Sequence, residues 1–302
     1  EFRRVLFRSM KVGLFTVLFS QLPWESALDK VKEFGIEAVE VGTGNYPGNA
    51  HCNPDLLLED SALRKRFKQA AIDRWLTISA LSCQGNPLHP NKEFAQKNHE
   101  TWRKTVELAS LLEIPVVCHF SGCPGDSPEA KNPNWVTCAW PNEYSEVLKW
   151  QWEEVAIPYW QKEAEFAKSK GIKIALEMHP GFLVYNPATL LKLREAAGDN
   201  IGANFDPSHL IWQGIDPVQA ILYLEDAIYH FHAKDTYLDK ANIAKKGVLD
   251  TASYTSLKER AWTFRSVGYG LDEKAWRDMV TALRLIGYDY VLSIEHEDPL
   301  AS

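Results

Sequence analysis

Acidic and imidazole side chains close four apolar, strand-like segments in the second half of the sequence. These segments end in Glu177-Met-His179, Asp206-Pro-Ser-His209, His232-Ala-Lys234-Asp235 and Glu295-His296-Glu297. Three carboxylates with one imidazole, and no thiol among them, suit Mn²⁺, Mg²⁺ or Co²⁺ better than a structural zinc ion. Without a cation, three like charges at short range could not all stay ionised. We therefore predict one divalent metal, with Mn²⁺ expected and Mg²⁺, Co²⁺ or Zn²⁺ as alternatives, bound by Glu177, Asp206, His232 and Glu295.

Eight short β-rich runs alternate with longer segments of helical period, which predicts a parallel sheet made of βαβ units. The runs are Lys11–Phe15, Ala38–Gly42, Leu76–Leu81, Pro115–Phe120, Ile172–Met178, Ile201–Phe205, Ile228–Ala233 and Tyr290–Glu295. Seven intervening helices, without a flexible linker between two halves, favour a single (β/α)8 TIM barrel over an open sheet. We expect no eighth helix in this sequence, because it stops soon after the last run; either the chain is truncated there or another subunit covers the gap. We expect one α/β catalytic domain over residues 10–302, and we interpret residues 1–9, before Met10, as a cloning or assembly remnant.

The barrel prediction brings the four polar strand ends together. Closing a parallel sheet gathers the C-terminal ends of its strands around one axis, where barrel active sites are built. Two connections longer than a barrel needs, 121–150 and 235–270, leave from the same end. The alternative is that each acidic or imidazole group is an isolated polar cap on its own strand.

The motif series resembles a known family. Glu177-x-His179, Asp206-Pro-Ser-His209, His232-x-Lys234-Asp235, Gly268-x-Gly270 and Glu295 are similar to the xylose-isomerase-like TIM-barrel superfamily, which covers sugar phosphate isomerases and epimerases. It includes ketose 3-epimerases, inosose dehydratases and metal-dependent 3-keto-glycoside deglycosidases. The resemblance implies that Glu177 and Glu295 bind the metal and also form the catalytic acid/base pair. It also implies that His209 contacts a substrate oxygen.

The chemistry that this resemblance implies follows from the donor set. A metal that chelates a carbonyl and an adjacent hydroxyl acidifies the intervening C–H and stabilises the enediolate. Carboxylates on opposite faces then give epimerisation, whereas one carboxylate working alone gives isomerisation or elimination. Leu183 and Leu238 replace an acidic residue and an arginine of the epimerases, which argues against a free ketohexose as substrate.

Further residues at the same end of the barrel are candidate substrate contacts, each with an ordinary structural alternative. His179 could instead cap loop backbone groups, Lys234 could pair with Asp235 or Glu295, and Arg265 could form a surface ion pair. Trp135 and Trp140 could stack on a sugar ring or merely fold the loop that carries them. The substrate-binding set that we predict is His209, His179, Lys234, His119, Trp140 and Arg265.

The charge and hydropathy of the sequence limit the classes of partner that the protein could bind. The net charge of −7 provides no positive field for a polyanion, so we expect no nucleic acid partner. The sequence contains no apolar run of ~20 residues and no signal peptide pattern. We expect a cytoplasmic protein that acts on a small-molecule carbohydrate without a membrane partner. A homo-oligomer or a small partner subunit, which could cover the place of the missing helix, stays open.

The leading hypothesis is a metal-dependent sugar isomerase or epimerase acting on a keto-sugar or substituted keto-glycoside. The main alternative is a 3-keto-glycoside deglycosidase, a lyase that expels the aglycone by β-elimination. The aromatic loop, the missing helix and the two leucines favour it. An abasic-site endonuclease would need further metal ligands and a basic face, which the acidic charge opposes. A non-catalytic scaffold or sugar sensor would not need a complete ligand set.

Overall fold

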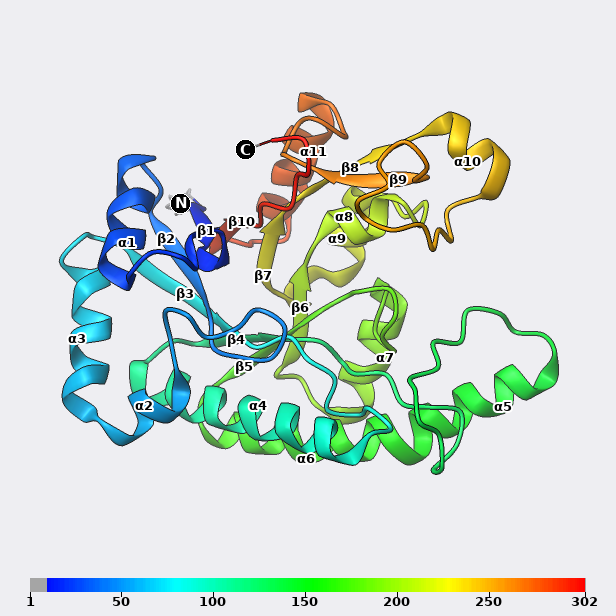
Figure 1. Cartoon of the computed structure of the whole chain (residues 1–302), viewed down its shortest axis with the longest axis horizontal. Coiled ribbons are helices and arrows are strands. Elements are labelled where there is room, and N and C mark those ends of the chain that lie inside the picture. The colour runs from blue at the N-terminus through cyan, green and yellow to red at the C-terminus, as the bar shows by residue number, and fades with distance from the viewer. Residues whose placement is uncertain (1–9, 302) are drawn as a thin grey trace, which may run out of the picture.

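The computed structural model describes residues 10–301 and confirms the barrel (Figure 1). Eight parallel strands close in the order β1-β10-β7-β6-β5-β4-β3-β2. They are β1 (Lys11–Phe15), β2 (Ala38–Gly42), β3 (Thr77–Ser82), β4 (Val116–His119), β5 (Lys173–Glu177), β6 (Ile201–Phe205), β7 (Ile228–Ala233) and β10 (Val291–Ile294). Each predicted run overlaps one observed strand, and the boundaries differ by at most one residue. The expectation for residues 1–9 lies outside the described residues.

Helices cover the outside of the barrel between successive strands. They are α1 (Trp24–Glu33), α2 (Pro54–Glu59), α3 (Ser61–Ile72), α4 (Lys92–Leu112), α5 (Asn142–Trp150), α6 (Ile157–Ser169), α7 (Pro187–Ala197), α8 (Pro207–Ile211), α9 (Pro217–Leu224) and α11 (Glu273–Leu285). Short helical turns η1 (Thr16–Phe19), η2 (Gln151–Ala156) and η3 (Glu225–Ala227) complete the set. No helix follows β10 in the part of the chain that the structure describes. None of the described helices is both long and apolar enough to cross a bilayer.

The starts of two helices follow from local sequence. Asn186 accepts a hydrogen bond from the backbone N–H of Thr189 at 2.9 Å, and Pro187 fills the first turn of α7, where a missing N–H is harmless. Asp216 caps α9 in the same way, with Pro217 after it. Both helices thus begin at an Asn or Asp cap followed directly by proline.

The connection after β7 is more ordered than an irregular loop. Strands β8 (Asp235–Leu238) and β9 (Trp262–Arg265) form an antiparallel pair, with α10 (Lys240–Lys246) between them. We call residues 235–265 the hairpin lobe; Figure 1 shows it projecting from the barrel beyond α8. Trp262 and Phe264 of this lobe pack with Trp212 in a small separate core. This strand pair was not predicted from the sequence, because its two short strands lie 23 residues apart and no turn signal lies between them.

The barrel interior is polar where β2, β6, β7 and β10 face one another. Glu40, Asn204, His232 and Ser293 are fully buried there. Buried polar groups in a core must find partners or hold a ligand, so this layer positions whatever chemistry the protein performs.

Candidate metal and active site

The four predicted ligands come together at the C-terminal mouth of the barrel. Each offers one donor atom, and these atoms all lie within 4.8 Å of one another. Glu177 ends β5, Asp206 follows β6 and caps α8, His232 lies in β7, and Glu295 follows β10. We call Glu177, Asp206, His232 and Glu295 the ligand cluster. Because adjacent parallel strands end at one height, four separate segments place their side chains around one point.

Two buried atoms of the ligand cluster lack a hydrogen-bond partner among the described residues. They are Nδ1 of His232 and Oδ2 of Asp206. Nδ1 of His232 lies 3.1 Å from Glu295 Oε2 and 3.7 Å from Glu177 Oε2, without a well-directed hydrogen bond to either. Oδ2 of Asp206 is near the Lys234 ammonium but makes no well-formed hydrogen bond, and a cation between the two atoms would satisfy both together. The residues therefore fit a divalent metal of the hard or borderline type.

The charges of the ligand cluster also favour a bound cation. Burial, and after it the charge of Glu295, raises the pKa of Glu177 to about 8. Burial also raises the pKa of Asp206, against the opposing charge of Lys234. Burial acts in the same direction on Glu295, but Lys234 and His232 outweigh it and hold the pKa of that carboxyl below its usual range. Carboxylates that repel one another in a dry site are relieved by a bound cation.

Lys234 partly balances this negative charge. Its side chain is 2% exposed, and its ammonium lies 2.6 Å from Glu295 Oε2 and 3.0 Å from Asp206 Oδ2. A third carboxylate, Glu297, is also 3.0 Å away. These carboxylates outweigh burial and raise the pKa of Lys234 well above its usual value. The expected pairing with Glu295 is therefore present, and the ammonium still lines the pocket beside the cluster.

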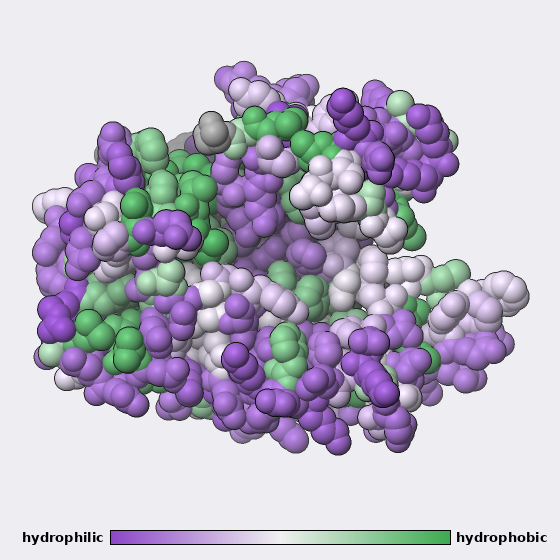
Figure 2. Space-filling model, viewed as in Figure 1, coloured by the Kyte–Doolittle hydropathy of each residue, from purple (hydrophilic) through white to green (hydrophobic). Residues whose placement is uncertain are grey.

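A pocket of about 380 Å³ opens above the ligand cluster, and we call it the site pocket. His179, His209 and Gln84 line it together with Glu177 and Glu295. The space-filling view shows a hollow with a hydrophilic floor between the hairpin lobe and the part of the barrel near α1 and β2 (Figure 2). Two carboxylates of the cluster are thus accessible to a small polar molecule.

The two candidate histidines lie beside the ligands. Nε2 of His209 is 3.2 Å from Glu177 Oε1 and 3.3 Å from Asp206 Oδ2. The His179 ring lies 4.0 Å from the His209 ring, and its Nδ1 donates to the carbonyl of Pro180. Burial lowers the pKa of His179 to about 4 and that of His209 well below its usual value, so both rings are neutral at physiological pH.

Three predicted substrate contacts lie elsewhere. His119 is wedged between Trp102 and Trp160, with ring centroids 5.2 and 5.9 Å away, and does not line the site pocket. Arg265 pairs with Asp298 at 3.1 Å, which is the ion-pair alternative. Trp140 is 75% exposed and does not line the pocket either. The direction of the His119 side chain at the end of β4, and the paths of the long connections that carry Trp140 and Arg265, could not be predicted from the sequence.

Gln84 is a residue of the site that none of the sequence motifs indicated. Its amide donates to Glu177 Oε2 at 3.1 Å, and the side chain lines the site pocket. Gln84 follows β3 by two residues, so the strand-end rule that found the other residues applies to it as well.

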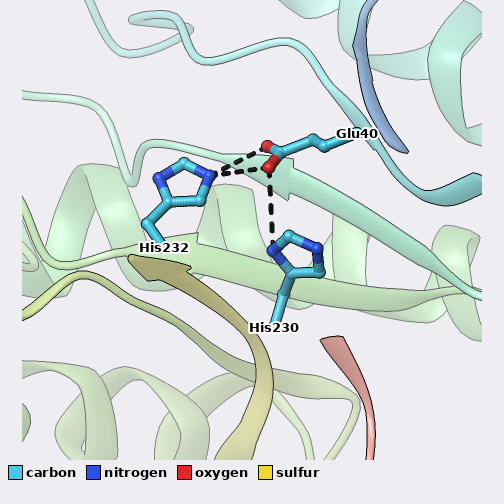
Figure 3. Close-up of side chains that lie close together, drawn as sticks. All are labelled: Glu40, His230 and His232. Atoms are coloured by element: carbon cyan, nitrogen blue, oxygen red, sulfur yellow. Dashed lines mark hydrogen bonds and ion pairs between the residues drawn. The ribbon is translucent and has the colours of Figure 1, made fainter. Parts of the chain in front are cut away.

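A second acid–imidazole group lies one layer deeper in the barrel (Figure 3). We call Glu40, His230 and His232 the core cluster. The carboxylate of Glu40 lies 2.9 Å from Nε2 of His232 and accepts hydrogen bonds from the hydroxyls of Ser82 and Ser293. Burial opposes the ionised form of Glu40, but His232 and His230 outweigh it and lower the pKa of this carboxyl. An ionised carboxylate only accepts, so Nε2 of His232 carries the proton and Nδ1 is left facing the ligand cluster.

Comparison with known proteins agrees with the barrel fold. The chain matches the family model described as "Xylose isomerase-like TIM barrel" over residues 28–301. It is 41% identical over 292 residues to the uncharacterized protein YfiH of Bacillus subtilis (strain 168), covering 96% of this chain and 93% of that protein. This chain therefore belongs to the xylose isomerase-like TIM-barrel family.

Solved structures share the fold at low sequence identity. The probable 3-DHS dehydratase AsbF, involved in petrobactin synthesis in Bacillus anthracis, superposes with a TM-score of 0.66 at 18% identity, covering 95% of this chain and 93% of that one. A D-tagatose 3-epimerase-like protein superposes with a TM-score of 0.63 at 22% identity, covering 96% and 91%. Proteins named as epimerases and as dehydratases thus share this fold.

Proposed function

We propose that this chain is a divalent-metal-dependent sugar isomerase or epimerase that removes a proton next to the carbonyl of a keto-sugar. The observation that carries the proposal is the ligand cluster itself, with two buried atoms that make no well-formed hydrogen bond and two carboxylates that also line the site pocket. Glu177, Asp206, His232 and Glu295 would hold the cation, with Mn²⁺ as the preferred ion. When bound, the cation supplies Lewis-acid polarisation of a carbonyl and its neighbouring hydroxyl.

Glu177 and Glu295 act as the acid/base pair in this proposal. One carboxylate takes the proton of the C–H bond, and the electron pair of that bond moves into the carbonyl to give an enediolate. The other carboxylate returns a proton to the opposite face, which inverts the carbon. Lys234 orients Glu295 through their 2.6 Å contact, and His209 contacts a substrate oxygen from its place beside Glu177.

A second candidate reaction begins with loss of the same proton and ends in elimination. The electron pair of the C–H bond then forms a C=C bond, and the C–O bond to a substituent at the next carbon breaks. The substituent leaves with the electron pair of that C–O bond and takes a proton. A cavity beside the site pocket favours this candidate, because it offers space for such a substituent.

Proton exchange with solvent tests both reactions. The chelator-treated and Mn²⁺-reloaded enzymes would be incubated in D₂O with a panel of ketoses and 3-keto-glycosides, and the products followed by NMR. We expect deuterium at the carbon next to the carbonyl only with the reloaded enzyme. Retained substituents indicate epimerisation or isomerisation, and a released aglycone indicates elimination. Absence of exchange with the whole panel would contradict the proposed function.

A further inference from the structure

A second cavity adjoins the site pocket. Its volume is about 310 Å³, and His179 and His209 line both spaces. We call it the side cavity. Its walls are largely aromatic and come from three segments far apart in the sequence: Trp135 from the loop after β4, Trp212 after α8, and Tyr254 and Trp262 from the hairpin lobe. A ligand at the ligand cluster can therefore extend past the two histidines into an aromatic chamber.

The aromatic walls are held in place by their own packing. The rings of Trp212 and Trp262 stack with centroids 4.7 Å apart and planes 4° from parallel. The Arg260 guanidinium lies over both Tyr254 and Trp262, at 4.1 and 4.4 Å from the ring centroids. A wall fixed before binding loses little conformational entropy when a ligand arrives, which favours affinity. The side cavity is thus preorganised.

The chemistry of the walls selects a neutral occupant. Among the described residues no lysine or arginine lines the side cavity. Its one carboxylate, Asp250, already accepts from the backbone N–H groups of Ala252 and Ala261. In the site pocket, Lys234 is paired with three carboxylates. A phosphate would therefore find no free cation in either space.

Size and shape favour a flat group over a small polar one. A cavity of about 150 Å³ in another protein takes up benzene, so the side cavity has room for an aromatic ring with substituents. Aromatic rings stack or meet edge to face with such a group, and each pair contributes about 0.5–1.5 kcal/mol beyond burial. The hydroxyls of Thr137 and Thr251 supply the few polar contacts that fix orientation in a pocket of this kind.

We propose that the side cavity binds a neutral, flat, aromatic substituent carried by the sugar, so that the substrate is an aryl-substituted keto-sugar and not a sugar phosphate or a free ketose. This inference rests on the proposed function, which places the sugar ring at the ligand cluster. The side cavity then binds the remainder of the substrate, beyond the sugar ring. Trp135, and not Trp140, is the tryptophan of the long loop that contacts it.

Binding of unreactive glycosides tests the inference without requiring turnover. Phenyl and methyl glycosides of glucose and of galactose, which lack a ketone, would be titrated into the Mn²⁺-loaded enzyme by calorimetry. We expect a phenyl glycoside to bind about tenfold more tightly than the matched methyl glycoside. Trp135→Ala should remove most of that preference. Thr137→Trp, which fills the cavity from an exposed position, should weaken the phenyl glycoside and leave the methyl glycoside unchanged.

Trp140→Ala is the matched control, because it changes the same residue type in the same loop outside both spaces. It should preserve the preference for phenyl. Equal binding of the two aglycones, no binding of any phenyl glycoside at millimolar concentration, or equal losses in the two tryptophan variants would overturn the inference. If the phenyl preference and its loss in Trp135→Ala are found but the D₂O panel shows no exchange, the cavity assignment stands and the proposed reaction fails.

Discussion

The ligand cluster and the core cluster both combine acidic and imidazole side chains and share His232, yet they differ in how their polar atoms are satisfied. In the core cluster, Glu40 accepts from three side chains, and His230 lies 3.1 Å from both Ser79 Oγ and Asn204 Oδ1. In the ligand cluster, Nδ1 of His232 and Oδ2 of Asp206 have no such partner among the described residues. The core cluster is sealed, whereas the ligand cluster borders a pocket.

This difference shows which of two similar groups is built for a ligand. Both groups have the composition of a metal site, but protein donors already occupy the lone pairs of the core cluster. Its role is then to orient: Glu40 fixes the proton of His232 on Nε2, and the free Nδ1 points at the other three ligands. A carboxylate behind a ligating histidine commonly tunes metal affinity in this way.

The largest expected effect comes from removing the acid/base carboxylates. Glu177→Gln and Glu295→Gln should each lower kcat by about 10²–10⁴, because an amide cannot accept the proton. Since the two residues act as a unit, the double variant should be scarcely slower than either single one. Turnover with the best substrate of the exchange panel measures this, alongside metal content.

Glu297→Gln is the control for this prediction. Glu297 also contacts Lys234, but it is 50% exposed and outside the ligand cluster. We expect a change of only a few-fold. Near-normal turnover in Glu177→Gln or Glu295→Gln, with metal retained, would remove that residue from the acid/base role.

Metal removal should destabilise the protein through the ligand cluster. A cation present at about 100 times its Kd stabilises the folded state by about 2.7 kcal/mol, which raises Tm by roughly 4 °C in a chain of this size. Calorimetric melting with Mn²⁺ and with chelator measures the shift. His232→Ala should melt at the same temperature in both conditions, and a persistent metal-dependent shift in that variant would place the cation elsewhere.

Glu40→Gln should weaken metal binding although Glu40 is not a ligand in this account. We expect Mn²⁺ affinity to fall by about 10–100-fold, because the amide no longer fixes the tautomer of His232. His230→Gln, which alters the core cluster without touching a ligand carboxylate, should cost only a few-fold. Competition with a chromophoric chelator measures both. Equal losses in the two variants would show that the core cluster acts only through general stability.

The smallest effect concerns His119, which belongs to neither cluster. Burial lowers its pKa to about 4, whereas in the unfolded chain a histidine titrates near pH 6.5. Between these values the unfolded state binds more protons, so stability falls as pH falls, by at most about 1.4 kcal/mol per pH unit. His119→Gln should flatten this part of the curve in urea unfolding without changing metal affinity. An unchanged slope would contradict the assignment.

Much of the ligand cluster could be predicted from sequence because each ligand closes an apolar run of strand length. The closed barrel then follows from eight such runs, and closure brings the ends together. The prediction of the eight strands and the four ligands therefore needed only the local sequence pattern and the rule that a closed barrel gathers its strand ends around one axis. The same rule could have predicted Gln84, because this residue also follows the end of a strand.

The core cluster depends on features that local pattern does not contain. The register of β2 with β3 shifts between Val39 and Glu40, and that of β6 with β7 shifts between Ala203 and Asn204. Such irregularities change which side chains point inward beyond them. The partners of Glu40 come from β7 and β10 as well as from β3, and only the closed barrel sets those distances. For Trp135 and Trp140, the packing of the loop decides which ring reaches the side cavity.

Anomalous diffraction from crystals soaked in Mn²⁺ tests the central claim most directly. We predict one strong anomalous peak bounded by Glu177, Asp206, His232 and Glu295, with Nδ1 of His232 as its nitrogen ligand and no peak between Glu40 and His230. A peak within the core cluster, or none at the ligand cluster under saturating Mn²⁺, would contradict the account.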